Sequence, residues 1–333
     1  MTYFRYIVVL VLLLFSVSCE KNNSNDIVKK PFEYEAFPSN LKEPVNSVFF
    51  IDSKTGFATV KGNVLKTTDG GLTWKPDSVS NLPLNVIYFV NNKIGYAAGG
   101  KSNCDGTGCT TPGSVIYKTN DSGNHWEKLN IPYKGSELNS ISFINENIGF
   151  AVGLGLHIKT VDGGKTWNQF ELGYQGLITK IAFINSQTGI CAGLFGNIYR
   201  TMDQGESWTK SDNESNGHIY DFCFVNEEVG YAGGQKEIIK TIDGGKTWKT
   251  LANSPSEIYF IHFSDVDNGI AIGKGHYTGG DWGIWTKAVY STSDGGKTWK
   301  KKDNIELGYS TSFFDKDNGY SIVPNKTFKI LMR

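Results

Sequence analysis

An eight-residue pattern recurs along the chain and constrains its fold more than any other feature of the sequence. The pattern reads Ser/Thr-x-Asp-x-Gly-x-x-Trp, and Thr241 to Trp248 is one copy. Its six copies contain the aspartates Asp69, Asp121, Asp162, Asp203, Asp243 and Asp294. Successive aspartates are 52, 41, 41, 40 and 51 residues apart. A period of ~40 to 50 residues predicts a repeat architecture.

Each residue type in the pattern has a local physical role. A short carboxylate such as Asp243 can accept hydrogen bonds from backbone N–H groups a few residues on, which closes a turn. Gly245 permits a positive φ, and Trp248 can bury roughly 150–250 Å² against the neighbouring unit. Six copies at this spacing cannot all line one site. We therefore predict that the six aspartates are structural, and that none is a catalytic acid or a metal ligand.

A second repeat indicates the number of units. It reads apolar-x-Phe, a polar turn, then Gly and an apolar pair, and Ile141 to Gly153 is a clear copy. The first glycine of this hairpin recurs at Gly56, Gly95, Gly149, Gly189, Gly230, Gly269 and Gly319. Seven hairpins and six Asp turns leave the last unit one strand short, because Thr327 to Met332 forms its third strand and the chain then ends.

The missing strand can come from the other end of the chain. In Pro31 to Phe37, apolar residues alternate with glutamates, as in a strand. The predicted fold is therefore all-β: a seven-bladed β-propeller of four-stranded antiparallel blades, with the N- and C-terminal strands in one blade. This closure leaves no open sheet edge.

The six-copy pattern is similar to the Asp-box, or bacterial neuraminidase repeat, which in its families joins the third and fourth strands of a propeller blade. The box occurs in sialidases, xyloglucanases, receptors and assembly factors, so the resemblance implies a fold rather than a function. Asp-box sialidases hold the substrate carboxylate with three arginines. This chain has Arg5, Arg200 and Arg333, of which Arg5 lies in a predicted signal peptide, so that triad cannot form. Xyloglucanase-type enzymes resemble two facing propellers, and this chain has room for one.

Among Asp-box propellers, the chain resembles the photosystem II stability/assembly factor family over about residues 45–332. The resemblance is carried by hairpins such as Gly95 to Gly99 and Gly230 to Gly233, and by boxes of the form Thr-x-Asp-Gly-Gly-Lys-Thr-Trp. It implies a non-enzymatic scaffold that holds other proteins during assembly. That family meets its partner with an arginine patch, and the three arginines here cannot make one. Photosystem binding is therefore not implied.

Residues 1–18 are typical of an export signal, because Arg5 precedes the apolar run Ile7 to Phe15 and small residues lead into Cys19. Ser18 followed by Cys19 resembles a bacterial lipobox, which implies that Cys19 is acylated and becomes the mature N-terminus. The alternative is an ordinary secretory signal that is cut near Ser18. Residues 19–30 are polar, so we predict that they form a flexible tether. We predict that residues 31–333 fold into a single propeller. We expect a lipid-anchored protein of the bacterial cell envelope, at the outer membrane, with the periplasmic or surface side left open.

Composition excludes one class of partner. Lys+Arg and Asp+Glu number 33 each, and no basic stripe indicates nucleic acid. Cys104 and Cys109 lie in a Gly-rich insertion and predict a disulfide in an oxidising compartment. The alternative, a metal site, needs further ligands nearby, so we predict no metal and no cofactor. Cys191 and Cys223 fall in predicted strands, as buried thiols do.

Two insertions contain residues that the repeats do not explain. Residues 101–113 and 274–286 both join a second strand to a third, in the second and sixth blades, so they should leave the same face of the ring. The later insertion contains the two tryptophans that lie outside the boxes. Its candidate binding residues are His276, Tyr277, Asp281, Trp282 and Trp285.

This aromatic loop has two interpretations. It is a stacking platform for a sugar or an anchor for a protein, or it folds back and buries its own tryptophans. For Asp281 or His276 the sequence indicates no second carboxylate or nucleophile, so no catalytic residue is predicted. The leading hypothesis is a non-enzymatic, monomeric, lipid-anchored propeller that binds a protein or glycan through these rim loops. The alternative is a glycan-active hydrolase with a different site.

Overall fold

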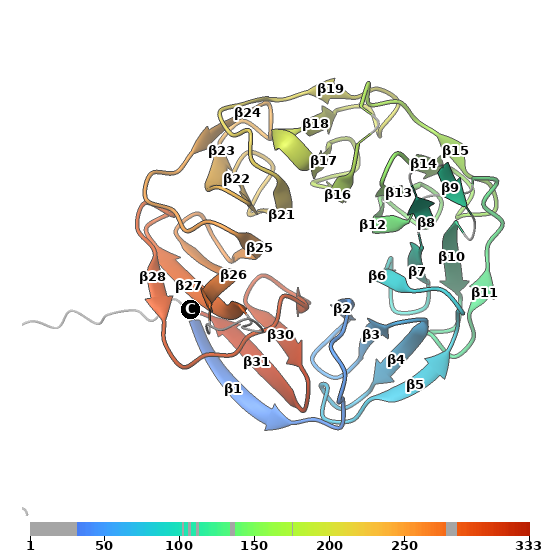
Figure 1. Ribbon diagram of the computed structural model, residues 1–333, viewed down its shortest axis with the longest axis horizontal. Helices are drawn as coiled ribbons and strands as arrows, with labels where there is room; N and C mark the ends of the chain where they lie inside the picture. The colour runs from blue at the N-terminus through green and yellow to red at the C-terminus, as the bar shows by residue number, and fades with distance from the viewer. Residues whose placement is uncertain are drawn as a thin grey trace, which may run out of the picture.

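The strands form a closed ring of seven sheets around a central axis (Figure 1), and the region along this axis is called the channel. The computed structural model describes residues 32–101, 103–105, 108–110, 113–133, 137–174, 176–277 and 285–333. For residues 103–105, 108–110, 276, 277 and 285 only the backbone is described. Within these ranges the predicted seven-bladed propeller is confirmed.

Blades are numbered in chain order, and each begins with the strand that lines the channel. Blade 1 comprises β2 (Ser47–Phe50), β3 (Gly56–Val60), β4 (Asn63–Thr67) and β5 (Lys75–Ser78). Blade 2 comprises β6 (Leu84–Phe89), β7 (Gly95–Gly100), β10 (Ser114–Thr119) and β11 (Glu127–Lys128). Blade 3 comprises β12 (Leu138–Phe143), β13 (Gly149–Gly153), β14 (His157–Thr160) and β15 (Asn168–Gln169). Blade 4 comprises β16 (Ile178–Phe183), β17 (Gly189–Gly193), β18 (Ile198–Thr201) and β19 (Thr209–Lys210).

The remaining blades follow the same order. Blade 5 comprises β21 (Ile219–Phe224), β22 (Gly230–Gly234), β23 (Ile238–Thr241) and β24 (Thr247–Thr250), and the short β20 (Asp212–Asn213) adds to β24 in parallel. Blade 6 comprises β25 (Ile258–Phe263), β26 (Asn268–Tyr277), β27 (Trp285–Ser293) and β28 (Lys300–Lys302). Blade 7 comprises β29 (Thr311–Phe313), β30 (Asn318–Val323), β31 (Lys326–Met332) and β1 (Phe32–Pro38).

The two ends of the described chain close the ring in blade 7 (Figure 1). Strand β1 pairs antiparallel with β31 along its whole length, from Phe32 opposite Met332 to Pro38 opposite Lys326. The predicted closure by N- and C-terminal strands is therefore confirmed. The first and last strands of the described chain, β1 and β31, thus lie in the same sheet.

A recurring aromatic contact explains the glycine of each hairpin. In blade 3 a Cβ on Gly149 would lie 2.2 Å from the ring of Phe143, so only glycine fits beneath that ring. On its other face Phe143 stacks against Tyr96 of blade 2, with ring centroids 4.1 Å apart. The same phenylalanine position, which we call the repeat phenylalanine, is occupied by Phe50, Phe89, Phe143, Phe183, Phe224, Phe263 and Phe313.

The hydrophobic core consists of seven clusters, one between each pair of neighbouring blades. A box tryptophan takes part in six of them, and Trp248, which is 1% exposed, packs between blades 4 and 5. The cluster between blades 6 and 7 instead contains Phe32, Phe328 and Met332. Blade 7 has no Asp-box, and its terminal strands provide the side chains that a tryptophan provides elsewhere.

The box aspartates close their turns. Thr241 donates its hydroxyl to Asp243 at 2.8 Å and accepts the Gly245 N–H at 2.9 Å. The Asp243 carboxylate accepts the backbone N–H and the hydroxyl of Thr247, at 2.9 and 2.7 Å. In the fourth box, hydrogen bonds from Ser207 lower the pKa of Asp203 to about 2. Both oxygens of the Asp243 carboxylate are thus engaged inside the turn, as the predicted structural role of the box aspartates requires.

Successive strands of a blade run in opposite directions, so their connections leave the ring on two different faces. One face has the connections from second to third strands and from each blade to the next, and we call it the insertion face. The opposite face has the Asp turns, and we call it the box face. In the first insertion β8 (Asn103–Asp105) pairs with β9 (Gly108–Thr110), and Cys104 lies opposite Cys109. That register is compatible with the predicted disulfide, which stays a prediction. In the second insertion Tyr277 pairs with Trp285.

The predicted signal peptide, Cys19 and the tether lie outside the described residues. Within the described part of the chain, no helix is long and apolar enough to cross a membrane.

Closure can be tested with two residues of β1. Phe32 is 5% exposed and belongs to the cluster between blades 6 and 7, whereas Tyr34 is 43% exposed. Phe32→Ala should lower the free energy of unfolding by about 3 kcal/mol, because it leaves a cavity at the closure. Tyr34→Ala should lower it by less than about 1 kcal/mol. Urea unfolding of both variants checks this, and equal effects would contradict a ring that depends on β1.

Candidate functional site

The candidate residues of the second insertion are placed only in part. Asp281 and Trp282 lie outside the described residues, and of His276, Tyr277 and Trp285 only the backbone is described. The prediction that the insertion leaves between the second and third strands of blade 6 is confirmed, since β26 continues to Tyr277 and β27 begins at Trp285. Whether these side chains bind a partner stays a prediction. The insertion face around them offers a better-defined candidate site.

One position of the repeat separates the blades into two groups. It lies four residues before the repeat phenylalanine, and in most innermost strands it coincides with an irregularity of the β-sheet register. In chain order, the seven blades have Asn46, Asn85, Asn139, Thr179, Tyr220, Tyr259 and Tyr309 at this position. A bulge in a strand redirects a side chain and is common next to functional sites.

In three of the first four blades this side chain is a latch between blades. Asn46 donates to the Leu84 carbonyl at 2.9 Å, and Asn85 donates to the Leu138 carbonyl at 3.1 Å. Thr179 donates to the Ile219 carbonyl at 2.7 Å. Each acceptor lies on the innermost strand of the next blade. The position therefore has a structural use in blades 1, 2 and 4.

Blades 5 to 7 have tyrosines at this position, and these form a continuous aromatic row. The Tyr220 and Tyr259 rings stack with centroids 4.9 Å apart and planes 8° apart. Tyr259 and Tyr309 follow at 4.8 Å, with planes inclined at 49°. We call these three residues the tyrosine ladder. All three are only partly buried; Tyr220 and Tyr259 lie at the insertion-face end of β21 and β25, and Tyr309 lies two residues before β29.

Charged groups flank the ladder. The Tyr259 hydroxyl donates to Glu257 at 2.9 Å, and the Lys274 ammonium lies 3.9 Å from the same carboxylate. The Lys287 ammonium lies 5.0 Å from the centre of the Tyr309 ring. Burial, with the bond to Glu257, raises the pKa of Tyr259, and burial also raises the pKa of Tyr220 and of Tyr309. The ladder hydroxyls are thus protonated at neutral pH. Lys274 and Lys287 lie on the strands that lead into the second insertion.

Phe195 extends the aromatic row onto blade 4. It lies in the short 3-10 turn η1 (Leu194–Gly196), is 65% exposed and has φ of 57°. A left-handed backbone at a bulky residue costs ~1–2 kcal/mol. Its ring packs edge-on against His218, with centroids 4.9 Å apart, and His218 leads on to Tyr220 at 6.3 Å. The Phe195 N–H also donates to His218 Nδ1 at 3.1 Å, so backbone and ring both contact this histidine.

The described arginines have structural partners. Arg200 donates to the Gly244 carbonyl of the next Asp turn at 2.7 Å, and Arg333 pairs with Glu33. The described residues also include no group of three or more His, Cys, Asp or Glu side chains that could hold a metal ion.

The sequence contained a signal for the ladder. Counting four residues back from each repeat phenylalanine gives three asparagines, a threonine and then three tyrosines. Without the register, these tyrosines resemble the many other aromatics of the chain. Phe195 and His218 carried no comparable signal, because only the folded ring places them beside Tyr220.

Comparison with known proteins supports the fold. Residues 110–224 match the family model of the photosynthesis system II assembly factor YCF48. A search of curated proteins gave no significant match. The chain is therefore a seven-bladed propeller that resembles this assembly factor.

Solved structures show the same fold at low sequence identity. YCF48 from Cyanidioschyzon merolae is 16% identical with a TM-score of 0.66, over 90% of this chain and 98% of that one. The GH74 enzyme from Niastella koreensis is 15% identical with a TM-score of 0.67, over 90% of this chain and 53% of that one. The WD40 repeats of RRP9 are 10% identical with a TM-score of 0.66, over 90% of this chain and all (100%) of that one.

If the ladder serves binding rather than folding, its tyrosines are replaceable. Tyr220→Thr removes a ring stack worth ~1 kcal/mol. It gives blade 5 the residue that Thr179 provides in blade 4, where the hydrogen bond between blades is worth about as much. The free energy of unfolding should therefore change by less than about 1 kcal/mol. The comparison is Phe222→Ala, two residues along the same strand and 2% exposed, which should cost about 3 kcal/mol. A loss from Tyr220→Thr as large as that from Phe222→Ala would show that the ladder belongs to the core.

Proposed function

We propose that this propeller is a non-enzymatic scaffold of the bacterial cell envelope that binds a protein partner through its insertion face. The observation that carries the proposal is the tyrosine ladder. Blades 5 to 7 replace a structural latch with partly exposed aromatics, on the face from which both insertions leave. The resemblance to an assembly factor over residues 110–224 supports binding rather than catalysis.

The geometry of the ladder favours a protein over a glycan. A sugar ring packs against a free aromatic face, but Tyr220 and Tyr259 cover each other's faces at 4.9 Å. The row therefore presents ring edges and hydroxyls, flanked by Glu257, Lys274 and Lys287. Tyrosines beside charged groups are typical of protein-binding hot spots.

The ladder can be tested with variants on the two faces. Tyr220→Thr/Tyr259→Thr should reduce recovery of the partner from a native envelope fraction at least ~10-fold, because hot-spot truncations cost about 2 kcal/mol or more. The matched control, Met202→Ser/Ile242→Ser, changes two apolar residues of the box face that are 63% and 70% exposed, and it should bind like the wild type. The measurement is quantitative pull-down with mass spectrometry, beside a glycan array.

Three outcomes would overturn this assignment. Equal loss of the partner in both double variants would show that the insertion face is not the binding surface. Glycans that bind the wild type and not the ladder variant would show that the ligand is a glycan instead of a protein. Cleavage of an array polysaccharide that Glu257→Gln abolishes would favour the hydrolase, which needs a pair of carboxyl groups ~5–9.5 Å apart.

The lipid anchor is part of the same proposal and rests on residues 1–19. Acylation of Cys19 would hold the propeller at a membrane, with residues 19–30 as the tether. In the native bacterium the wild-type protein should incorporate labelled palmitate and partition into detergent, and Cys19→Ala should do neither. A Cys19→Ala protein that still partitions like the wild type would contradict the anchor. Ser18→Ala is the matched control, since it keeps the cysteine.

A further inference from the structure

The channel also has a recessed region at its other mouth, on the box face. Two cavities of about 330 and 370 Å³ lie there, the first between blades 4 and 5 and the second between blades 5, 6 and 7. They share four lining residues: Lys180, Cys223, Phe224 and Val225. The cavities therefore adjoin, and each is in the size range of small-molecule sites, ~300–1,000 Å³.

The first cavity exists because of small residues at one repeat position. Directly before the repeat phenylalanine, blades 1 and 2 have Phe49 and Tyr88, whose rings pack together with centroids 5.5 Å apart. Blades 4 and 5 have Ala182 and Cys223 at the same position, and both line the cavity. Phe183, Phe222 and Phe224 form much of the remaining wall. The opening thus lies where this position is small, unlike in blades 1 and 2. Ser142 of blade 3 and Ser312 of blade 7 are small at the same position as well.

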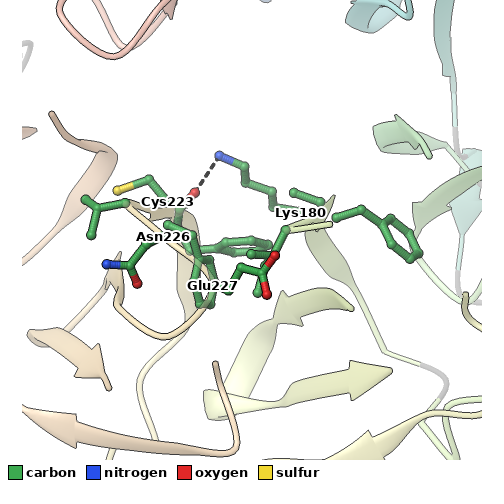
Figure 2. Close-up of a pocket in the computed structure, with 10 residues that line it drawn as sticks. Lys180, Cys223, Asn226 and Glu227 are labelled. Carbon is green, nitrogen blue, oxygen red and sulfur yellow. Dashed lines mark hydrogen bonds between the residues drawn. The ribbon is translucent and has the colours of Figure 1, made fainter. Parts of the chain in front are cut away.

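Lys180 lines both cavities and is a hydrogen-bond donor common to them. Figure 2 shows its side chain extending from blade 4 toward the strand of Cys223, where its ammonium donates to the Phe222 carbonyl at 2.8 Å. It also pairs with Asp221. The other Asp221 oxygen accepts the Ile261 N–H at 2.9 Å, so both oxygens of this carboxylate have a partner in the protein. An ammonium has three N–H donors, and one remains for a ligand.

Charged groups of both signs line the cavities. Asp221 balances Lys180, and Asp315 and Lys316 balance each other in the second cavity, whereas Glu227 gives the first cavity a net negative charge. Burial raises the pKa of the Cys223 thiol to about 12 and lowers the pKa of His262 to about 4. Both are therefore uncharged at neutral pH. His262 Nε2 donates to the Lys316 carbonyl at 2.8 Å, and its ring stacks on Phe313 with centroids 3.6 Å apart.

We propose that the box-face mouth of the channel binds a small neutral molecule with an aromatic or aliphatic body and one hydrogen-bond acceptor. The phenylalanine walls take the apolar body, and the third Lys180 N–H takes the acceptor. A carboxylate ligand would add a negative charge beside Asp221 and Glu227, and an ammonium ligand would meet Lys180. This site is separate from the tyrosine ladder and does not depend on the function proposed for it.

Three probes with one apolar body test the proposal: phenylacetamide, phenylacetate and 2-phenylethylamine. Each is titrated into the purified full propeller by ligand-observed NMR. Phenylacetamide should bind at least ~5-fold more tightly than either charged probe, because phenylacetate brings a negative charge beside Asp221 and Glu227, and 2-phenylethylamine brings a positive charge to Lys180 without an acceptor for it.

Two variants link binding to the cavities. Ala182→Tyr copies Tyr88 of blade 2 into the first cavity and should weaken phenylacetamide binding at least ~10-fold. Ala252→Tyr, at an exposed position, is its control and should leave binding unchanged. Lys180→Met should abolish the preference for phenylacetamide over the charged probes. If Lys180→Met fails to fold, Ala182→Tyr still tests the proposal. Equal affinity for all three probes, or unchanged binding to Ala182→Tyr, would overturn the proposal.

Discussion

The ring depends on one contact that is repeated around it, the repeat phenylalanine between a glycine of its own blade and a side chain of the preceding blade. Phe143 shows the constraint, since a Cβ on Gly149 would lie 2.2 Å from its ring and Tyr96 stacks on the other face at 4.1 Å. Such a site accepts neither a larger residue than glycine nor a smaller one than phenylalanine without strain or a cavity. The interfaces between blades, rather than the sheets themselves, therefore restrict the sequence most.

This constraint leaves few positions of the innermost strands free to vary, and these positions contain the departures that suggest function. Four residues before the repeat phenylalanine, small polar residues such as Asn46 and Thr179 latch neighbouring blades, whereas Tyr220 and Tyr259 stack and remain partly exposed. Directly before it, the rings of Phe49 and Tyr88 pack together, whereas Ala182 and Cys223 line a cavity. The tyrosines and the cavities both lie in blades 4 to 7.

The two candidate sites use opposite mouths of the channel and different chemistry. On the insertion face, ring edges, hydroxyls and paired charges suit a broad macromolecular contact, which gains its affinity from a few aromatic anchors. On the box face, a recess with apolar walls and a single spare donor suits a small ligand. The strand alternation of a propeller makes such a division possible, because residues near the two ends of one strand, such as Tyr220 and Cys223, belong to different faces.

The sequence by itself determined the architecture, because the Asp-box and hairpin repeats are local patterns that recur at blade spacing, and because their unequal numbers required β1 to complete blade 7. It also indicated that the box aspartates are structural and that the insertions share a face. It did not determine the candidate sites. The ladder joins three residues about 40 to 50 positions apart, and the cavities depend on which side chains are small at equivalent positions of neighbouring blades. Local patterns specify strands and turns, whereas only closure of the ring brings Phe195, Tyr220 and Tyr309 into one row and sets Ala182 beside Cys223.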